Sequence, residues 1–201
     1  IGTEELPAAY LPDLIEKLNL LAKLILAEYH LDHASVESFG TPRRLVLIIR
    51  GLSSVQHKPA EEIRGPSKQA AYDAAGKPTK ALTGFLSSRG GTLQQTKLVS
   101  SDKGDYIYLI KPPTKTPTMT LLPTLLPQLI GRLRAPKTMR WDIGGVRFAR
   151  PIRWLLALYG SMPIRCAVGR LTSAPRTRLG RPQALRETRV TSIAHYLQTL
   201  T

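Results

Sequence analysis

The stretch KTMRWDIGGVRFARPIRW, residues 137–154, holds both tryptophans of the chain and interleaves basic with aromatic side chains. Its basic residues are Lys137, Arg140, Arg147, Arg150 and Arg153, and its large aromatics are Trp141, Phe148 and Trp154. Arginine holds phosphate through paired hydrogen bonds and stacks on flat rings, so the pattern is typical of a surface that binds a polyanion, RNA in particular. The alternative is that the aromatics belong to the core and the arginines form a solvated rim, and composition favours neither.

The end of this stretch also predicts part of the fold. Apolar and aromatic residues continue through it, which predicts a strand over residues 145–159. A second apolar run over 163–168 is expected to pair with it across Gly160-Ser161. Trp154 would then lie in the core, while the neighbouring arginines form a row that faces an anion.

Charge is distributed unevenly along the 201 residues, whose net charge is +15. Residues 1–30 carry five acids and two lysines, whereas residues 131–190 carry fourteen basic residues and two acids. A concentrated positive field attracts nucleic acid or an anionic membrane surface. The apolar fraction of 42% is ordinary for a globular protein, and the length suffices for one or two domains with a real core.

Cysteine content and hydropathy limit which classes of protein this chain can belong to. The single cysteine, Cys166, excludes a disulfide within the chain and a cysteine-based metal site, and its place in the run IRCAVG predicts a buried structural thiol. No stretch approaches the ~20 apolar residues of a membrane span, and no signal-peptide pattern is present, so we expect a cytoplasmic protein. Ile1-Gly2 has the character of a strand already under way, which predicts that the sequence is a portion of a longer chain.

The sequence predicts an α+β fold with mixed or antiparallel sheets, helices packed on them, and a small inserted α+β subdomain. The main domain is expected over 1–52 and 113–201. Apolar residues three and four apart predict a helix over 8–27, and the run after the turn at Gly40-Thr41-Pro42 predicts a strand over 44–52. Arg43 and Arg44 at that junction could hold an anion or protect a sheet edge, and charge alone favours the edge.

The inserted subdomain is expected over 53–112. Its first part is polar and ends in a Gly-Pro turn at Gly65-Pro66. Two short helices over 67–74 and 79–88 follow, and then a hairpin whose turn contains Gly104.

The last third of the chain contains three further predicted elements. Leucine spacing predicts a helix over 117–133 that kinks or starts at Pro123 or Pro127, because proline in a helix interior costs about 3 kcal/mol. The arginine-rich stretch 170–189 is expected to be a loop. A short amphipathic helix is expected to close the chain near Ile193–Leu200.

Known catalytic patterns are missing from the sequence, which contains no P-loop, no GxGxxG and no GxSxG. His30 and His33 could face one metal ion together, but no third ligand lies near them in sequence. The residues therefore favour a binding module over a self-contained catalyst.

Seven segments, taken in order, resemble the β subunit of the bacterial two-subunit glycyl-tRNA synthetase. They are IGTEELP at 1–7, TPRRL at 41–45, RGPS at 64–67, DAAGKPTKALTGF at 73–85, SDKGDYIY at 101–108, MRW at 139–141 and RFARPIRWLLALYG at 147–160. One segment departs from the family pattern: Leu179-Gly180-Arg181-Pro182 stands where the family usually carries Gly-His-Arg-Phe. Any role of that histidine therefore does not carry over to this chain.

The resemblance implies the N-terminal portion of a subunit that helps to attach glycine to its tRNA. It also implies that ATP and Mg²⁺ are used on the separate α subunit, that this portion binds no cofactor and no metal and is not catalytic by itself, and that α and β subunits assemble into a tetramer. The partners would then be the α subunit and tRNA for glycine, with no membrane. The residues expected to contact tRNA phosphates are Arg140, Arg147, Arg150, Arg153, Arg176 and Arg178.

Two other hypotheses stay open at this point. The chain could be a basic scaffold that docks the α subunit without touching tRNA. A generic basic protein that binds RNA or a membrane surface would also explain the charge, but it leaves the seven ordered segments unexplained.

Overall fold

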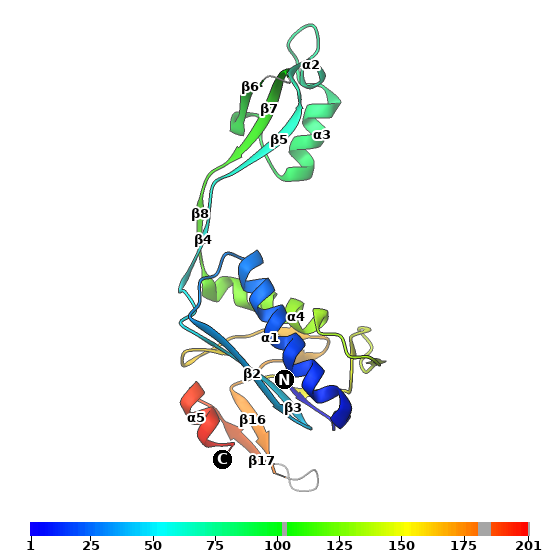
Figure 1. Cartoon of the computed structure of the whole chain (residues 1–201), viewed down its shortest axis with the longest axis vertical. Coiled ribbons are helices and arrows are strands. Elements are labelled where there is room, and N and C mark those ends of the chain that lie inside the picture. The colour runs from blue at the N-terminus through cyan, green and yellow to red at the C-terminus, as the bar shows by residue number, and fades with distance from the viewer. Residues whose placement is uncertain (102–103, 181–185, 201) are drawn as a thin grey trace. The chain divides into compact units, whose positions relative to one another are not determined.

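The computed structural model describes residues 1–101, 104–180 and 186–200 (Figure 1). Helices and antiparallel sheets both occur, which confirms the predicted α+β class. The chain divides into two compact units: unit 1 comprises residues 1–56 and 116–201, and unit 2 comprises residues 57–115.

Unit 1 is built on a four-stranded antiparallel sheet whose strand order is β11-β1-β3-β2. Its strands are β1 (Gly2–Thr3), β2 (Ser35–Thr41), β3 (Arg44–Arg50) and β11 (Ile152–Trp154). β2 and β3 form a regular hairpin, with Ser35 opposite Arg50 and Thr41 opposite Arg44. β1 joins this hairpin to β11, so both chain segments of unit 1 contribute strands to one sheet.

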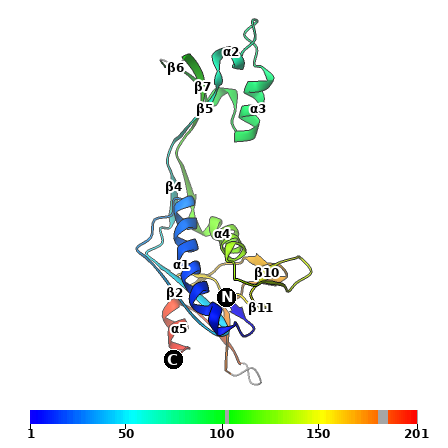
Figure 2. The same ribbon diagram turned by 45° about the vertical axis from the view of Figure 1, so that its right-hand side comes forward.

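Helix α1 (Leu11–Glu28) lies against this sheet, and α4 (Thr118–Arg132) packs on α1 (Figures 1 and 2). A short 3-10 turn, η1 (Ala8–Tyr10), precedes α1, so the predicted helix over 8–27 is confirmed with a tighter first turn. Of the α1 residues that the spacing places on one face, Leu14, Leu18, Ile25 and Leu26 are buried, and Ala22 is buried with them. Leucines of α4 and the side chain of Phe148 complete the same core.

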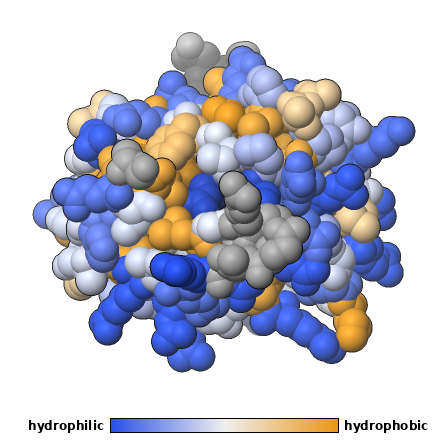
Figure 3. Space-filling view, turned by 90° about the horizontal axis from the view of Figure 1, so that it is seen from below, coloured by the Kyte–Doolittle hydropathy of each residue, from blue (hydrophilic) through white to orange (hydrophobic). Residues whose placement is uncertain are grey.

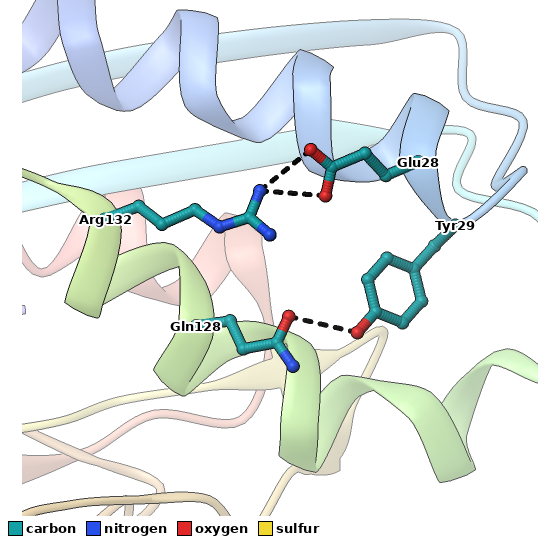
Figure 4. Close-up of polar contacts among 4 residues, drawn as sticks. All are labelled: Glu28, Tyr29, Gln128 and Arg132. Atoms are coloured by element: carbon teal, nitrogen blue, oxygen red, sulfur yellow. Dashed lines mark hydrogen bonds and ion pairs between the residues drawn. The ribbon is translucent and has the colours of Figure 1, made fainter. Parts of the chain in front are cut away.

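Polar contacts join the C-terminal end of α1 to α4 (Figure 4). Arg132 Nη1 donates to both carboxylate oxygens of Glu28, at 2.9 and 2.8 Å. The Tyr29 hydroxyl donates to Gln128 Oε1 at 3.0 Å. Glu28, Gln128 and Arg132 are exposed and Tyr29 is half-buried, so the apolar core contributes far more to the packing of the two helices than these contacts do.

Helix α4 begins at Thr118, and Pro123 and Pro127 both lie inside it. Of the two alternatives that the sequence left open, a start at one of these prolines is wrong, and a kink stays a prediction. Each proline removes one backbone donor, but Leu122, Leu125, Leu129 and Ile130 are buried on one face. Their burial offsets the lost hydrogen bonds.

The chain from 139 to 190 forms short two-stranded ribbons, and β11 joins the main sheet. The ribbon strands are β9 (Met139–Arg140), β10 (Arg147–Phe148), β12 (Leu158–Tyr159), β13 (Met162–Pro163), β14 (Ala167–Val168), β15 (Leu171–Thr172), β16 (Arg176–Leu179) and β17 (Arg186–Arg189). The continuous strands expected over 145–159 and 163–168 are wrong, because irregular segments interrupt both, although β12 and β13 do pair across Gly160-Ser161.

The loop expected over 170–189 is also wrong, because β16 and β17 pair over four residues. Residues 181–185 of that stretch, including Arg181-Pro182, lie outside the described residues. Helix α5 (Ile193–Gln198) is present as predicted, and Cys166 is buried as predicted.

Unit 2 contains a three-stranded antiparallel sheet of order β5-β7-β6, with strands β5 (Glu61–Ser67), β6 (Thr96–Ser101) and β7 (Gly104–Lys111). Its helices are α2 (Lys68–Ala71) and α3 (Lys80–Arg89), followed by the 3-10 turn η2 (Leu93–Gln95). The two helices lie on one side of the strands (Figures 1 and 2). Their small core consists of Ala71, Leu82, Leu86, Ile107 and Leu109. The chain enters and leaves unit 2 along the paired strands β4 (Val55–Lys58) and β8 (Thr114–Pro117).

Both predicted helices and the pairing of the predicted hairpin are confirmed in unit 2, while the turn residues 102–103 lie outside the described part. The turn expected at Gly65-Pro66 is wrong, because strand β5 runs through it. The register against β7 shifts there: Arg64 is opposite Tyr108, and Ser67 is opposite Tyr106. One extra residue on β5 makes this a β-bulge, which proline tolerates because a bulge does not need every backbone donor.

Candidate nucleic-acid interface

The ribbon β9–β10 places two of the predicted arginines side by side. Arg140 lies directly opposite Arg147 in the antiparallel register, and both side chains are exposed. Arg147 donates to Thr138, from Nε to Oγ1 at 3.3 Å and from Nη2 to the backbone oxygen at 3.4 Å. Like charges directly opposite on paired strands repel, and an anion bound between them would remove the repulsion.

The single acid of this segment does not neutralise the pair. Asp142 Oδ1 accepts a hydrogen bond from the Val146 backbone nitrogen at 3.0 Å and closes the loop between β9 and β10. Within the described residues its carboxylate forms no ion pair. Asp142 is therefore a structural residue of the loop, and the positive charge of Arg140 and Arg147 faces solvent.

The aromatics of the segment behave differently from its arginines. Phe148 is 1% exposed within the core of unit 1, and Trp141 is half-buried against that core. Arg150 follows the buried pair Phe148-Ala149 and is exposed, and its side chain contacts no polar partner among the described residues. Phe148 and Trp141 thus pack toward the core while Arg140, Arg147 and Arg150 are exposed, as the rim alternative predicted for these residues.

A second group of arginines surrounds a hollow of about 570 Å³ in unit 1. Its lining includes Arg153, Arg176, Arg178 and Arg189, with Trp154 and the single acid Glu187. Arg176 lies directly opposite Arg189 in the β16–β17 register, so this ribbon repeats the arginine pair of β9–β10. The hollow therefore carries more positive than negative charge, as a phosphate site requires.

Two glutamates compensate part of this charge. Glu187 pairs with Arg176 at 3.5 Å and with Arg178 at 3.1 Å, and Arg153 forms an ion pair with Glu4. Arg178 is half-buried and the other paired side chains are more exposed, and exposed ion pairs exchange readily with a competing anion.

Trp154 is not the core residue that the sequence predicts. It is half-buried, and the guanidinium carbons of Arg44 and Arg178 lie 6.0 and 5.8 Å from its ring centroid. Arg44 Nη2 donates to the backbone oxygen of Arg178 at 2.8 Å, which joins the main sheet to β16. Arg44 therefore acts inside the fold rather than as a free edge charge.

The phenol of Tyr196 on α5 lies near the same arginine. Burial raises the pKa of Tyr196, and contacts with Arg44 and Thr177 oppose that increase. Together Arg44, Trp154 and Tyr196 link β3, β11 and α5.

A larger groove of about 690 Å³ also belongs to unit 1, and its walls are mainly apolar. They come from β3, from leucines of α4, and from residues 154–160, with Ile193 and Tyr196 of α5. In Figure 3, hydrophobic residues form part of the surface near the middle of the view, and most residues at the edge of the view are hydrophilic. Such a groove suits an apolar partner segment better than a polyanion.

Among the described residues, no three histidine, cysteine or carboxylate side chains are arranged to hold a metal ion. Across residues 1–101, 104–180 and 186–200, no helix combines the length and apolar character that a membrane crossing requires. The fold and the arginine surfaces thus define a class: a basic α+β module that can hold a polyanion.

Comparison with known proteins defines the family. The family model for the glycyl-tRNA synthetase beta subunit matches residues 1–201, and the chain belongs to this family, as its seven segments predicted. The glycine–tRNA ligase beta subunit of Desulforudis audaxviator is 38% identical over 177 residues, which cover 88% of this chain and 26% of that protein. The beta subunit of Citrifermentans bemidjiense is 39% identical over 198 residues, covering 98% of this chain and 29% of that protein.

A relative from Chlamydia muridarum, named glycine–tRNA ligase, is 38% identical over 183 residues, which cover 86% of this chain and 18% of that protein. The chain thus spans well under a third of the length of these curated relatives.

Of the six arginines expected to contact tRNA, Arg140 and Arg147 lie on the β9–β10 ribbon, Arg153, Arg176 and Arg178 line the hollow, and Arg150 belongs to neither group. Sequence reasoning did not single out Arg189, although alternating residues around an arginine-rich turn could have indicated a hairpin. The pairing of Arg44 with Trp154 carries no local signal, because the two residues are distant in sequence.

Proposed function

We propose that this chain is a tRNA-contacting portion of a glycyl-tRNA synthetase β subunit. The observation that carries the proposal is the repeated arginine pair, Arg140 with Arg147 and Arg176 with Arg189, on two exposed ribbons. Both pairs place guanidinium groups on one side of a two-stranded ribbon, where phosphate oxygens can accept their hydrogen bonds. Family membership supplies a natural polyanion, because relatives are named glycine–tRNA ligase.

The same proposal assigns the chemistry of glycine attachment to the other subunit. ATP and Mg²⁺ would be used there, and the α and β subunits would assemble into the cytoplasmic heterotetramer that the family resemblance implies. The residues of this chain would hold and orient tRNA. Binding energy supplied away from the reacting atoms still contributes to positioning the reacting end.

A salt series tests the proposal. The affinity of the chain for tRNA, measured by fluorescence anisotropy, should fall with rising salt, with a log–log slope of about −4 to −5 if six phosphates are neutralised. Replacing Arg140 and Arg147 by alanine should make the slope shallower by about 1.5 to 2. The control replaces Lys17 and Arg132, which lose the same charge but pair with Asp13 and Glu28. A slope near zero for the unmodified chain would contradict the proposal.

The apolar groove supports a second candidate function, docking of the α subunit. This function predicts that a polar substitution in the groove, such as Leu126→Gln, weakens the α–β complex and leaves tRNA affinity unchanged. Co-purification of the subunits after nuclease treatment would measure it. The two functions are compatible, because the groove and the β9–β10 ribbon use different residues.

A further inference from the structure

The sheet of unit 2 has one face that its helices do not cover. Residues directly opposite on neighbouring strands share a face, so Ile63, Leu109 and Thr96 lie on the side of the buried core. The other side includes Glu62, Arg64, Lys97, Val99, Tyr106, Tyr108 and Ile110, which we name the open face. Within unit 2 the two tyrosines are half-buried, and Arg64 and Lys97 are exposed.

The centre of the open face is a row that crosses all three strands. Arg64 on β5, Tyr108 on β7 and Lys97 on β6 lie directly opposite one another in the two registers. An aromatic ring is thereby flanked by a cation on each neighbouring strand. Neither cation forms an ion pair with any residue that the structure describes in unit 2.

The bulge in β5 brings Arg64 onto a second ring. The guanidinium carbon of Arg64 lies 3.7 Å from the centroid of the Tyr106 ring, a stacking distance. Tyr106 is not opposite Arg64 but one step further along the face, and the register shift between Arg64 and Ser67 accommodates this contact. Gly65 is required at the bulge, because a Cβ there would lie 2.7 Å from Phe85 and 2.9 Å from the Ile107 oxygen.

The charges of the open face also favour an anion. Its one acid among the described residues is Glu62, at the end of the sheet opposite Ile110, whereas Asp105 lies on the helix side of the register and accepts from Ser100. Flat rings, a stacked guanidinium and flanking cations are the components that bind unpaired bases and their phosphates.

We propose that the open face of unit 2 binds unpaired nucleotides of RNA by stacking bases on Tyr108 and on the Arg64–Tyr106 pair. Lys97 and Arg64 hold the adjoining phosphates. This surface differs in kind from the arginine ribbons of unit 1, which contact the backbone and need no accessible base. The inference rests on the proposed RNA-binding function, but it uses residues that the ribbons do not share.

Binding of a labelled oligoribonucleotide of about eight adenosines tests this inference, with an unlabelled blunt RNA duplex as competitor. Tyr108→Leu should lower the affinity of the whole chain for the oligonucleotide about tenfold, because leucine lacks the stacking ring. Tyr108→Phe, which keeps the ring, should retain affinity within about twofold. Lys97→Ala should weaken binding and reduce the salt slope by about 0.7, while the matched control Lys77→Ala, whose lysine lies in the loop before α3, should change neither.

Several outcomes would overturn the inference. They are equal losses for Tyr108→Leu and Tyr108→Phe, equal losses for Lys97→Ala and Lys77→Ala, efficient competition by the duplex, or no binding of the oligonucleotide. Hydrogen exchange of the β7 amides confirms that each variant remains folded. One combination separates the two proposals: the Arg140 and Arg147 variants keep full tRNA affinity while Tyr108→Leu weakens oligonucleotide binding. This result would contradict tRNA binding by the ribbons and support nucleotide binding by the open face.

Discussion

The two units present their positive charge in opposite ways. In unit 1, arginines project from short ribbons in facing pairs, and the aromatic Phe148 of the same segment is buried. In unit 2, Arg64 lies flat on Tyr106 and the rings remain on the surface of a sheet. The first arrangement suits a regular double-stranded backbone, and the second suits bases that have left the stack. The contrast shows that basic residues alone do not determine which part of a nucleic acid a surface binds. The side chains beside the basic residues determine it.

The largest expected effect concerns the core beneath the open face. Leu109→Ala should destabilise unit 2 by about 2–5 kcal/mol, because Leu109 is fully buried in a core of only five buried residues. Hydrogen exchange should show early loss of protection in β5 to β7, with α1 still protected. The matched change Leu98→Ala, at a residue 42% exposed on the neighbouring strand, should cost less than about 0.5 kcal/mol. Simultaneous loss of protection in both units would mean that they unfold as one.

The bulge gives the next largest effect. Gly65→Ala should destabilise unit 2 by about 1–3 kcal/mol, because the new methyl group meets Phe85 and a backbone oxygen. Gly84→Ala is the control: nothing lies within 4 Å of its Cβ position in α3, so it should stabilise by about 0.4–1 kcal/mol. Thermal unfolding followed by circular dichroism measures both. A neutral Gly65→Ala would mean that the bulge has room to shift.

Replacing both arginines of the β9–β10 ribbon should have an intermediate effect on tRNA and almost none on the oligonucleotide. Arg140→Ala with Arg147→Ala should lower tRNA affinity about tenfold at moderate salt, since two phosphate contacts are lost. Protein stability should rise slightly or stay unchanged, because the two like charges no longer face each other. An equal loss for the oligonucleotide would remove the distinction between the two surfaces.

The smallest predicted effect is a gain rather than a loss of tRNA affinity. Glu187→Gln removes the acid between Arg176 and Arg178 and should raise tRNA affinity about two- to threefold at low salt. Glu28→Gln removes a comparable exposed acid that faces Arg132 on the helices, and should leave affinity unchanged. Anisotropy titrations at two salt concentrations compare them. An equal increase for both variants would indicate a response to net charge alone.

The elements that the sequence predicted correctly are those whose apolar residues recur with a regular local spacing. Leucine spacing identified α1, and alternation identified the β6–β7 hairpin, because side-chain period alone determines which face each residue takes. Strand β5 was missed because Gly65-Pro66 marks a turn and a bulge equally well in a sequence. The β16–β17 hairpin was missed because its strands carry few apolar residues.

The site was predictable in composition but not in geometry. Arg140, Arg147 and Arg176 stood out by charge, yet their pairing across ribbons depends on register, which charge does not encode. The contact between Arg64 and Tyr106 depends on one extra residue in β5. The spacing of apolar residues in the sequence does not indicate that extra residue.

The strand pair β4–β8 has a consequence for the order of folding. Residues 57–115 separate β3 from α4, and an unstructured excursion of that length would add loop-closure entropy to the assembly of the unit 1 core. Unit 2 is rich in contacts between neighbouring elements, and its early folding would draw β4 and β8 together. We therefore expect the folded insertion to shorten the effective loop between β3 and α4, and so to reduce the loop-closure entropy that the packing of α4 on α1 has to overcome.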